Sequence, residues 1–346
     1  MKCSKAARLA LLAALAAMPA APANAQAPTG LQHEVVFSDY TPLAGNAELL
    51  RRMLSPLDEA QVQHTLNQQS EQLSAQSVDL AQERFVLYVP PKAPAGGYAL
   101  LVFVPPWHDA RLPEGWPEVL DRYDMICVSA ARSGNDQNVS ARREPLALLA
   151  AYNVMQRYPV NPAHVYVAGF SGGSRVAMRL AVGYPDLFRG ALLNAGADPL
   201  GVPGAAIPPA ELMQRLQESS RLVYVTGERD PVLPTDVQSR QSMHKWCVAN
   251  VDSQITLGRS HEALNAFAFN NALRALTSAP QPDTGKLAAC RAGLQHELEP
   301  QLARVQTLIG SGKHGEAQKL LRELDRQFGG LAAPASLELQ RQLGGS

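Results

Sequence analysis

Net charge, metal-binding motifs and long apolar stretches are all missing from this sequence. Its 346 residues include 31 basic and 31 acidic side chains, so the formal net charge is zero. Nothing electrostatic therefore favours nucleic acid or an anionic membrane surface as a partner. The eight histidines are scattered, and no Cys-x-x-Cys pair, His-Glu-x-x-His helix or Gly-Lys-Ser phosphate loop occurs. We expect a protein that needs no metal or cofactor and binds no nucleic acid.

The apolar run near the N-terminus is too short to cross a bilayer. Residues 9–18 contain only Leu, Ala and Met, whereas a membrane-spanning helix takes about 20 apolar residues. Basic residues precede this run, and Ala23-Asn24-Ala25 forms a small-x-small cleavage site. This order is typical of a secretory signal peptide. We predict that residues 1–25 are removed and that the protein is periplasmic or secreted, with no membrane span.

Cysteine is scarce, and one of the four, Cys3, lies in the predicted signal peptide. The remaining three, Cys127, Cys247 and Cys290, permit at most one bridge within the chain. Cys127 sits in an apolar run and is most simply a buried thiol. A disulfide between Cys247 and Cys290 is compatible with an oxidising compartment, but the sequence leaves it open because it gives no distance between them.

Apolar runs alternate with helical patterns through the middle of the chain. Continuous apolar runs, as opposed to alternating ones, indicate strands that are buried on both faces. The predicted strands cover residues 85–89, 98–104, 125–129, 164–169, 190–194, 221–226 and 253–257. Strands that alternate with helices predict an α/β domain, with a mostly parallel sheet covered by helices on both faces. We place this domain at residues 83–279, after an N-terminal extension at residues 26–82.

The last segment, residues 280–346, is polar and helical. Two amphipathic stretches, residues 297–309 and 316–328, flank Gly310-Ser311-Gly312. They resemble one tetratricopeptide-type hairpin, and a short helix can follow Pro334. A single hairpin cannot make a solenoid, which needs about three repeats. We interpret the segment as a C-terminal helical cap; the alternative is a docking site for a protein partner.

The motif that carries chemistry is Gly169-Phe170-Ser171-Gly172-Gly173. It follows the apolar run at residues 164–168 directly and precedes a helical pattern, which is the context of a nucleophile elbow. Small flanking residues permit the tight turn that lifts a serine hydroxyl to the carboxyl edge of a sheet. We therefore predict that Ser171 is a nucleophile; the alternative is a glycine-rich turn without chemistry.

A serine needs a base, and the base needs an acid that orients it. On such a fold the chain order is serine, acid, histidine. His261 is the one histidine in a loop between the last predicted strand and a helix, and we predict that it is the base. For the acid, Gly227-Glu228-Arg229-Asp230-Pro231 offers two carboxylates. The spacing before the proline favours Asp230, with Glu228 as the alternative.

Two backbone N–H groups are expected to form an oxyanion hole. One belongs to the residue after the nucleophile, Gly172, and the other comes from the loop after residues 100–104. Pro105 and Pro106 open that loop and have no N–H group to donate. Trp107 is thus the first available donor, and His108 is the next.

Residues 158–173, residues 184–190 and Asn194-Ala195-Gly196 resemble bacterial esterases of the polyhydroxybutyrate depolymerase and feruloyl-esterase-like group. The wider resemblance, to the α/β-hydrolase superfamily, covers residues 84–277. It implies an α/β-hydrolase fold with a triad of Ser171, Asp230 and His261. Two departures occur: Pro105-Pro106 replaces the family's usual His-Gly, and the family's usual alanine after the nucleophile is replaced by glycine. No separate domain for binding a solid polymer is recognisable.

These features favour a serine hydrolase that cleaves a carboxylic ester, small or oligomeric, through an acyl-enzyme on Ser171. Two alternatives remain from the sequence. Peptidases and amidases use the same elbow, so hydrolysis of an amide is the nearest alternative. The other is a catalytically silent binding module that recruits a partner through its C-terminal helices; the unusual Pro105-Pro106 loop is its main support.

Overall fold

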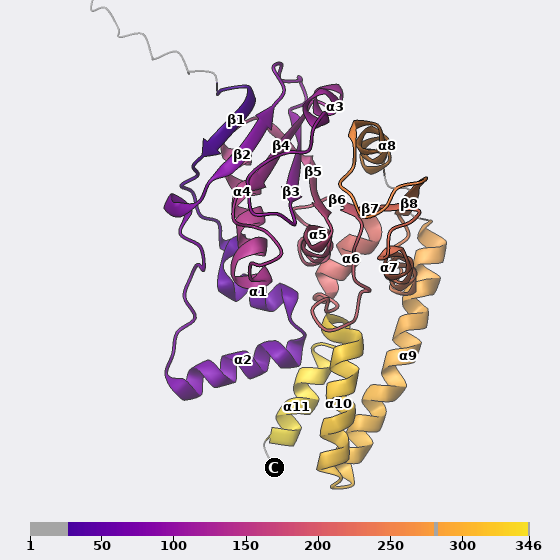
Figure 1. Ribbon diagram of the computed structural model, residues 1–346. Coiled ribbons are helices and arrows are strands. Elements are labelled where there is room, and N and C mark those ends of the chain that lie inside the picture. Colours follow the sequence, from indigo (N-terminus) through magenta and orange to yellow (C-terminus); the bar gives the residue numbers. More distant parts are fainter. Residues whose placement is uncertain (1–26, 280–282, 345–346) are drawn as a thin grey trace, which may run out of the picture.

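The computed structural model describes residues 27–279 and 283–344 (Figure 1). The predicted signal peptide, residues 1–25, lies outside the described residues, as does the proline-rich joint at residues 280–282. None of the helices in the described residues is long and apolar enough to span a membrane.

One eight-stranded sheet forms the centre of the molecule, with strand order β1-β2-β4-β3-β5-β6-β7-β8. Its strands are β1 (Gly30–Val35), β2 (Phe85–Val89), β3 (Tyr98–Val104), β4 (Met125–Ala130), β5 (Val160–Phe170), β6 (Gly190–Asn194), β7 (Arg221–Gly227) and β8 (Val251–Thr256). The β1–β2 and β2–β4 pairs are antiparallel, and all pairs from β4 to β8 are parallel. This order, with its single β3–β4 exchange, is that of the α/β-hydrolase fold, which confirms the predicted fold class.

Side chains alternate between two apolar cores, one on each face of the sheet. In β3, Leu100, Val102 and Val104 belong to one core, whereas Leu101 and Phe103 belong to the other. The burial of both faces explains why the strand sequences are continuously apolar.

Helices cover both faces of this sheet. The first core is closed mainly by α4 (Glu144–Arg157), α5 (Gly172–Gly183) and α6 (Ala210–Ser219), and the second by α3 (Trp116–Arg122) and α8 (Ala266–Leu276). Between β7 and β8 the chain forms α7 (Leu233–Lys245). The ring of Trp116 in α3 stacks on Phe269 in α8, with centroids 3.8 Å apart.

The N-terminal extension contributes an edge strand that the sequence did not indicate. β1 is half exposed and its residues are mixed in polarity, so it has neither a buried run nor strict alternation. After a short turn at Pro42–Ala44, α1 (Asn46–Met53) packs near α5, and α2 (Pro56–Gln69) reaches the C-terminal helices (Figure 1). Ser55 caps α2 by accepting a hydrogen bond from the Asp58 N–H group.

Three helices, α9 (Thr284–Gly310), α10 (His314–Phe328) and α11 (Ala335–Gly344), form the C-terminal segment. The first begins at Thr284, capped by Asp283, well before the predicted start at residue 297, and it continues through Pro300. Ala317 is fully buried between the helices, in a small core with Val305, Leu321 and Leu339. A disulfide joins Cys247, just after α7, to Cys290 in α9, across a sequence separation of 43 residues.

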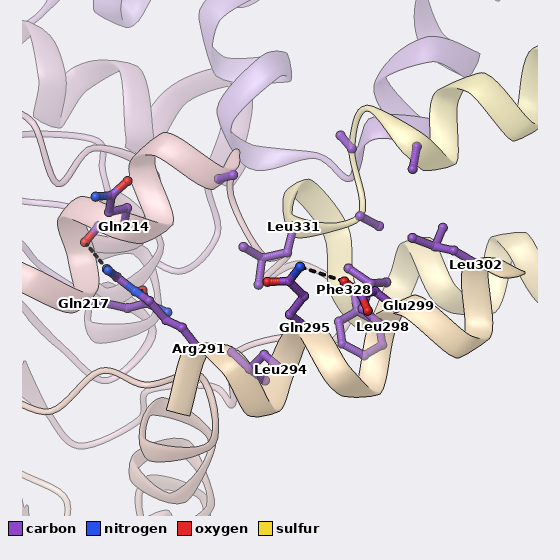
Figure 2. A pocket seen from close by; sticks show the side chains of 14 residues that line it. Gln214, Gln217, Arg291, Leu294, Gln295, Leu298, Glu299, Leu302, Phe328 and Leu331 are labelled. Carbon is purple, nitrogen blue, oxygen red and sulfur yellow. Dashed lines mark hydrogen bonds between the residues drawn. The ribbon is translucent and has the colours of Figure 1, made fainter. Parts of the chain in front are cut away.

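A groove of about 470 Å³ lies where α9 approaches the end of α6. Leu294 and Leu298 of α9 line it together with Phe328 and Leu331, whereas Arg291 reaches back to α6 (Figure 2). There its guanidinium donates to the Gln217 side-chain carbonyl at 2.6 Å. This groove is lined by none of the predicted site residues.

Candidate functional site

The turn at Ser171 has the strained backbone that a nucleophile elbow requires. Ser171 links β5 to α5 with φ of +56° and ψ of −124°, a conformation that non-glycine residues rarely adopt. The conformation is held because the Ser171 N–H group donates to the Asn194 carbonyl at 2.9 Å and the Ser171 carbonyl accepts from Ser174 N–H at 2.9 Å. The hydroxyl is thereby presented at the carboxyl edge of the sheet.

Two glycines make this turn possible. A Cβ atom on Gly169 would lie 2.1 Å from the Gly173 carbonyl oxygen, and a Cβ atom on Gly173 would lie 2.0 Å from the Val104 carbonyl oxygen. Both distances are far below van der Waals contact. The glycines recognised in the sequence thus allow helix α5 to pack directly against β3 and β5.

The structure brings the three predicted residues Ser171, Asp230 and His261 into one hydrogen-bonded chain. His261 Nε2 lies 2.9 Å from Ser171 Oγ, and His261 Nδ1 lies 3.0 Å from Asp230 Oδ2 and 3.1 Å from Oδ1. The Asp230 side chain is fully buried, whereas that of His261 is one-third exposed. Each residue follows the carboxyl end of a different strand, namely β5, β7 and β8.

Backbone hydrogen bonds hold the loops of Asp230 and His261 together. The Arg229 N–H group donates to the Arg259 carbonyl at 2.8 Å. Asp230 Oδ1 also accepts from the Val232 N–H group at 2.9 Å, which fixes the carboxylate. Glu228, the alternative acid, accepts instead from Gly258 N–H at 2.9 Å and does not contact His261. The geometry therefore favours Asp230 as the partner of His261.

On the oxyanion side, Gly172 is the first residue of α5, so its N–H group lies at the positive end of the helix dipole. The Trp107 indole packs between Phe103 and Phe170, with centroid separations of 5.7 and 6.3 Å, and Arg111 covers its face. That the backbone N–H group of Trp107 donates to the oxyanion stays a prediction. Asn135, which the sequence analysis missed, lies against Gly172: a Cβ atom on Gly172 would meet Asn135 Oδ1 at 2.1 Å.

Asp236 is a second residue that the sequence analysis missed. Its buried carboxylate accepts from the Gly196 and Ala197 N–H groups at 3.2 and 2.7 Å and from Thr226 Oγ1 at 2.6 Å. Burial raises the pKa of this carboxyl above its usual range. Through its hydrogen bonds the Asp236 carboxylate fixes the loop after β6, and this loop packs behind Ser171. An acid in the first turn of a helix is common, so nothing in the sequence distinguished it.

A cavity of about 460 Å³ opens beside Ser171 and His261. Its other walls come from Asn135, the start of α5, the loop after β6, and the segment that precedes α4. Within residues 27–279 and 283–344, no group of three or more His, Cys, Asp or Glu side chains is placed to hold a metal ion. The arrangement can activate a hydroxyl nucleophile next to a space that is large enough for a small organic substrate.

Two curated proteins are similar to parts of the chain. One, from Nocardia uniformis subsp. tsuyamanensis and described provisionally as the esterase NocK, is 39% identical over 77 residues, which are 22% of this chain and 20% of that protein. A poly(3-hydroxybutyrate) depolymerase of Ralstonia pickettii is 31% identical over 98 residues, or 24% of this chain and 20% of that protein. The chain thus spans about a fifth of the length of these relatives.

No family model matches the chain. Among solved structures, a ferulic acid esterase is similar with a TM-score of 0.42 and 17% identity, over 56% of this chain and 90% of that one. An S-formylglutathione hydrolase of Staphylococcus aureus has a TM-score of 0.45 and 12% identity, over 56% and 91%. The protein has the α/β-hydrolase fold, established by its strand order, and it resembles esterases of that type over limited stretches.

Proposed function

We propose that this protein is a serine hydrolase that cleaves a carboxylic ester through an acyl-enzyme on Ser171. The single observation that carries the proposal is the hydrogen-bonded chain in which His261 contacts Ser171 through one ring nitrogen and Asp230 through the other. The local similarity to an esterase and to a depolymerase of a polyester supports an ester as the bond that is broken.

The reaction follows from this geometry. His261 Nε2 accepts the Ser171 proton while Ser171 Oγ attacks the ester carbonyl, and Asp230 stabilises the imidazolium. Charge on the carbonyl oxygen develops toward the N–H group of Gly172, with Trp107 as the proposed second donor. The alcohol leaves with the proton from His261. A water molecule, deprotonated by His261, then attacks the acyl-enzyme. The bond between the acyl carbon and Ser171 Oγ breaks, His261 returns the proton to Ser171 Oγ, and the acid is released.

A signal peptide at residues 1–25 remains part of this proposal, and it would place the enzyme in the periplasm or outside the cell. The disulfide between Cys247 and Cys290 is consistent with such an oxidising compartment. The C-terminal helices are proposed to act as a cap, since α10 and α11 pack against α9 and α2.

Turnover of matched substrates tests the proposal. We expect 4-nitrophenyl butyrate to be hydrolysed by the wild type, and the corresponding butyryl anilide much more slowly. Ser171→Ala should abolish both activities while the circular dichroism spectrum stays unchanged. Folded wild-type protein that hydrolyses neither compound would contradict the proposal, and preferential cleavage of the anilide would favour an amidase.

A further inference from the structure

Three arginines line the cavity beside Ser171. They are Arg143, which ends the segment before α4, and Arg175 and Arg179, which lie on successive turns of α5. The one acidic side chain among the residues that line this cavity is Asp198. A cavity next to a nucleophile is thus bordered mainly by positive charge, in a chain whose overall net charge is zero.

Two of the three guanidinium groups are already neutralised by protein carboxylates. Arg175 Nε lies 3.1 Å from Asp198 Oδ1. Arg179 forms an ion pair with Glu144, whose side chain is fully buried, and also contacts Ser140 Oγ at 3.4 Å. These pairs engage Asp198 and Glu144, and neither carboxylate forms an ion pair with Arg143.

Arg143 is buried and forms no ion pair of its own, although the charges of Asp136 and Glu144 act on it. Only 3% of its surface is exposed, and its Nη2 donates to the Pro105 carbonyl at 2.9 Å. Its Nε has no hydrogen-bond partner among the described residues, and the guanidinium forms no ion pair with Asp136 or Glu144, the nearest acids. A buried charge with an unmade hydrogen bond costs free energy unless a partner completes it. A bound anion would be such a partner.

Burial lowers the pKa of Arg143 to about 10, against the raising effect of Asp136 and Glu144. The guanidinium therefore remains a cation at neutral pH. The hydrogen bond to the Pro105 carbonyl holds the guanidinium beside the loop where the second oxyanion donor is expected.

Its position in the chain also favours a role in binding. Residues Val139–Arg143 form a π-helical turn, capped by Asn138, which runs into α4. Such turns are rare in proteins, and those that occur often lie at functional sites. Val139 and Ser140 of the same turn line the cavity together with Arg143. The turn thus directs three of its five residues to the space beside Ser171.

We propose that Arg143 binds a carboxylate carried by the substrate, so that the preferred substrate is an ester that also carries a free carboxylate. The inference rests on the proposed ester hydrolysis. A guanidinium without an ion pair matches a single negative charge, which favours a carboxylate over a phosphate dianion, and its fixed N–H donors suit the two oxygens of a carboxylate.

Matched pairs of esters test this inference. On the acyl side, 4-nitrophenyl half-esters of adipic, suberic and sebacic acids are compared with the same compounds after methylation of the free carboxyl. On the alcohol side, 4-acetoxybenzoate is compared with its methyl ester. In at least one pair we expect the wild type to prefer the anion about tenfold to hundredfold in kcat/KM, as is typical of a charged hydrogen bond. Arg143→Gln should abolish that preference, and Arg143→Lys should restore part of it.

The neutral esters separate binding from structure. If Arg143 only supported the Pro105 loop, Arg143→Gln would slow the neutral and anionic esters equally, which would overturn the inference. The double variant Arg175→Gln/Asp198→Asn removes an ion pair from the same cavity at no change in net charge, and we expect it to alter the preference by less than about threefold. Equal rates on both members of every pair in the wild type would also overturn it.

A binding measurement keeps the inference independent of turnover. Monomethyl adipate is titrated into Ser171→Ala by calorimetry, and we expect binding that disappears in Ser171→Ala/Arg143→Gln. Absence of hydrolysis of every ester would refute the proposed function alone. Hydrolysis of neutral esters without preference for, or binding of, a carboxylate would refute the role of Arg143 alone.

Discussion

The carboxyl edge of the sheet and the three C-terminal helices differ in how firmly the surrounding protein holds them. At the sheet edge, Ser171 and Asp230 follow strands that are buried where they end, and His261 follows the half-exposed strand β8. Backbone hydrogen bonds fix the loops of Asp230 and His261. In α9, by contrast, only Leu287, Leu298 and Val305 of 27 residues are buried. The sheet edge is thus held by buried strand ends and loop hydrogen bonds, whereas the helices depend on a few buried side chains and one disulfide. Substitutions should therefore have very different consequences in the two regions.

The largest difference in kcat/KM is expected between substitutions of two buried aspartates. Asp230→Asn should reduce kcat/KM for 4-nitrophenyl butyrate about ten-thousandfold, because an amide cannot hold His261 in the required tautomer or stabilise its cation. Asp325→Asn in α10 is the matched control: Asp325 accepts from the Leu57 N–H group at 3.2 Å, far from the proposed chemistry. Steady-state kinetics of both variants checks this. Equal kcat/KM values for the two variants would contradict the expected difference between the sheet edge and the C-terminal helices.

A smaller effect, on stability, is expected from Gly169→Ala. The added Cβ atom would lie 2.1 Å from a backbone oxygen that cannot move without displacing α5. We expect a loss of more than about 4 kcal/mol in the free energy of unfolding, or no folded protein at all. Urea denaturation and soluble yield measure it. Wild-type stability in this variant would show that the elbow is much looser than described.

Removal of the disulfide should affect stability without affecting activity. Cys290→Ser frees a loop that the bond closes over a sequence separation of 43 residues. Loop-closure entropy predicts a destabilisation of about 2–4 kcal/mol. The bond ties α9 to the chain just after α7 and touches none of the three proposed catalytic residues, so kcat/KM should stay within about twofold of the wild type below the unfolding transition. A parallel loss of turnover would show that the helices support the site.

The smallest expected effect is a gain in stability. Gly293 lies on the exposed side of α9, and a Cβ atom there would meet nothing within 4 Å. Gly293→Ala should stabilise the protein by about 0.5–1 kcal/mol, because alanine loses less backbone entropy in a helix. Thermal unfolding of this variant beside Gly169→Ala gives the sharpest comparison of the two regions. Destabilisation would mean that the exposed face of α9 is covered.

The sequence predicted the parts of the molecule that depend on local signals. Continuous apolar runs marked the buried strands, and the glycines around Ser171 marked the turn, because only small residues fit there. Strand β1 and helices α3 and α6 escaped prediction, since each spans no more than ten residues and offers few positions for a pattern. The extra turns of α9 before residue 297 escaped because that stretch lacks a clear apolar face.

The cavity beside Ser171 could not be predicted in the same way. Asn135 and Arg143 lie close together in the segment before α4, and Asp236, which holds the loop after β6, lies in the first turn of α7. Each has a residue type that is ordinary at its position. Their roles follow from distances across the fold. The lack of an ion pair at Arg143 likewise depends on contacts across the fold, since Arg175 and Arg179 engage Asp198 and Glu144.

The most direct test of the central claim is to locate the residue that reacts with a fluorophosphonate. The wild-type protein is labelled, digested and sequenced by mass spectrometry, with His261→Gln as a folded control. The proposed mechanism predicts one adduct, on Ser171, and labelling that is at least about a hundredfold slower in His261→Gln, because the base that activates the hydroxyl is gone. An adduct on another residue, or none on folded wild-type protein, would contradict it.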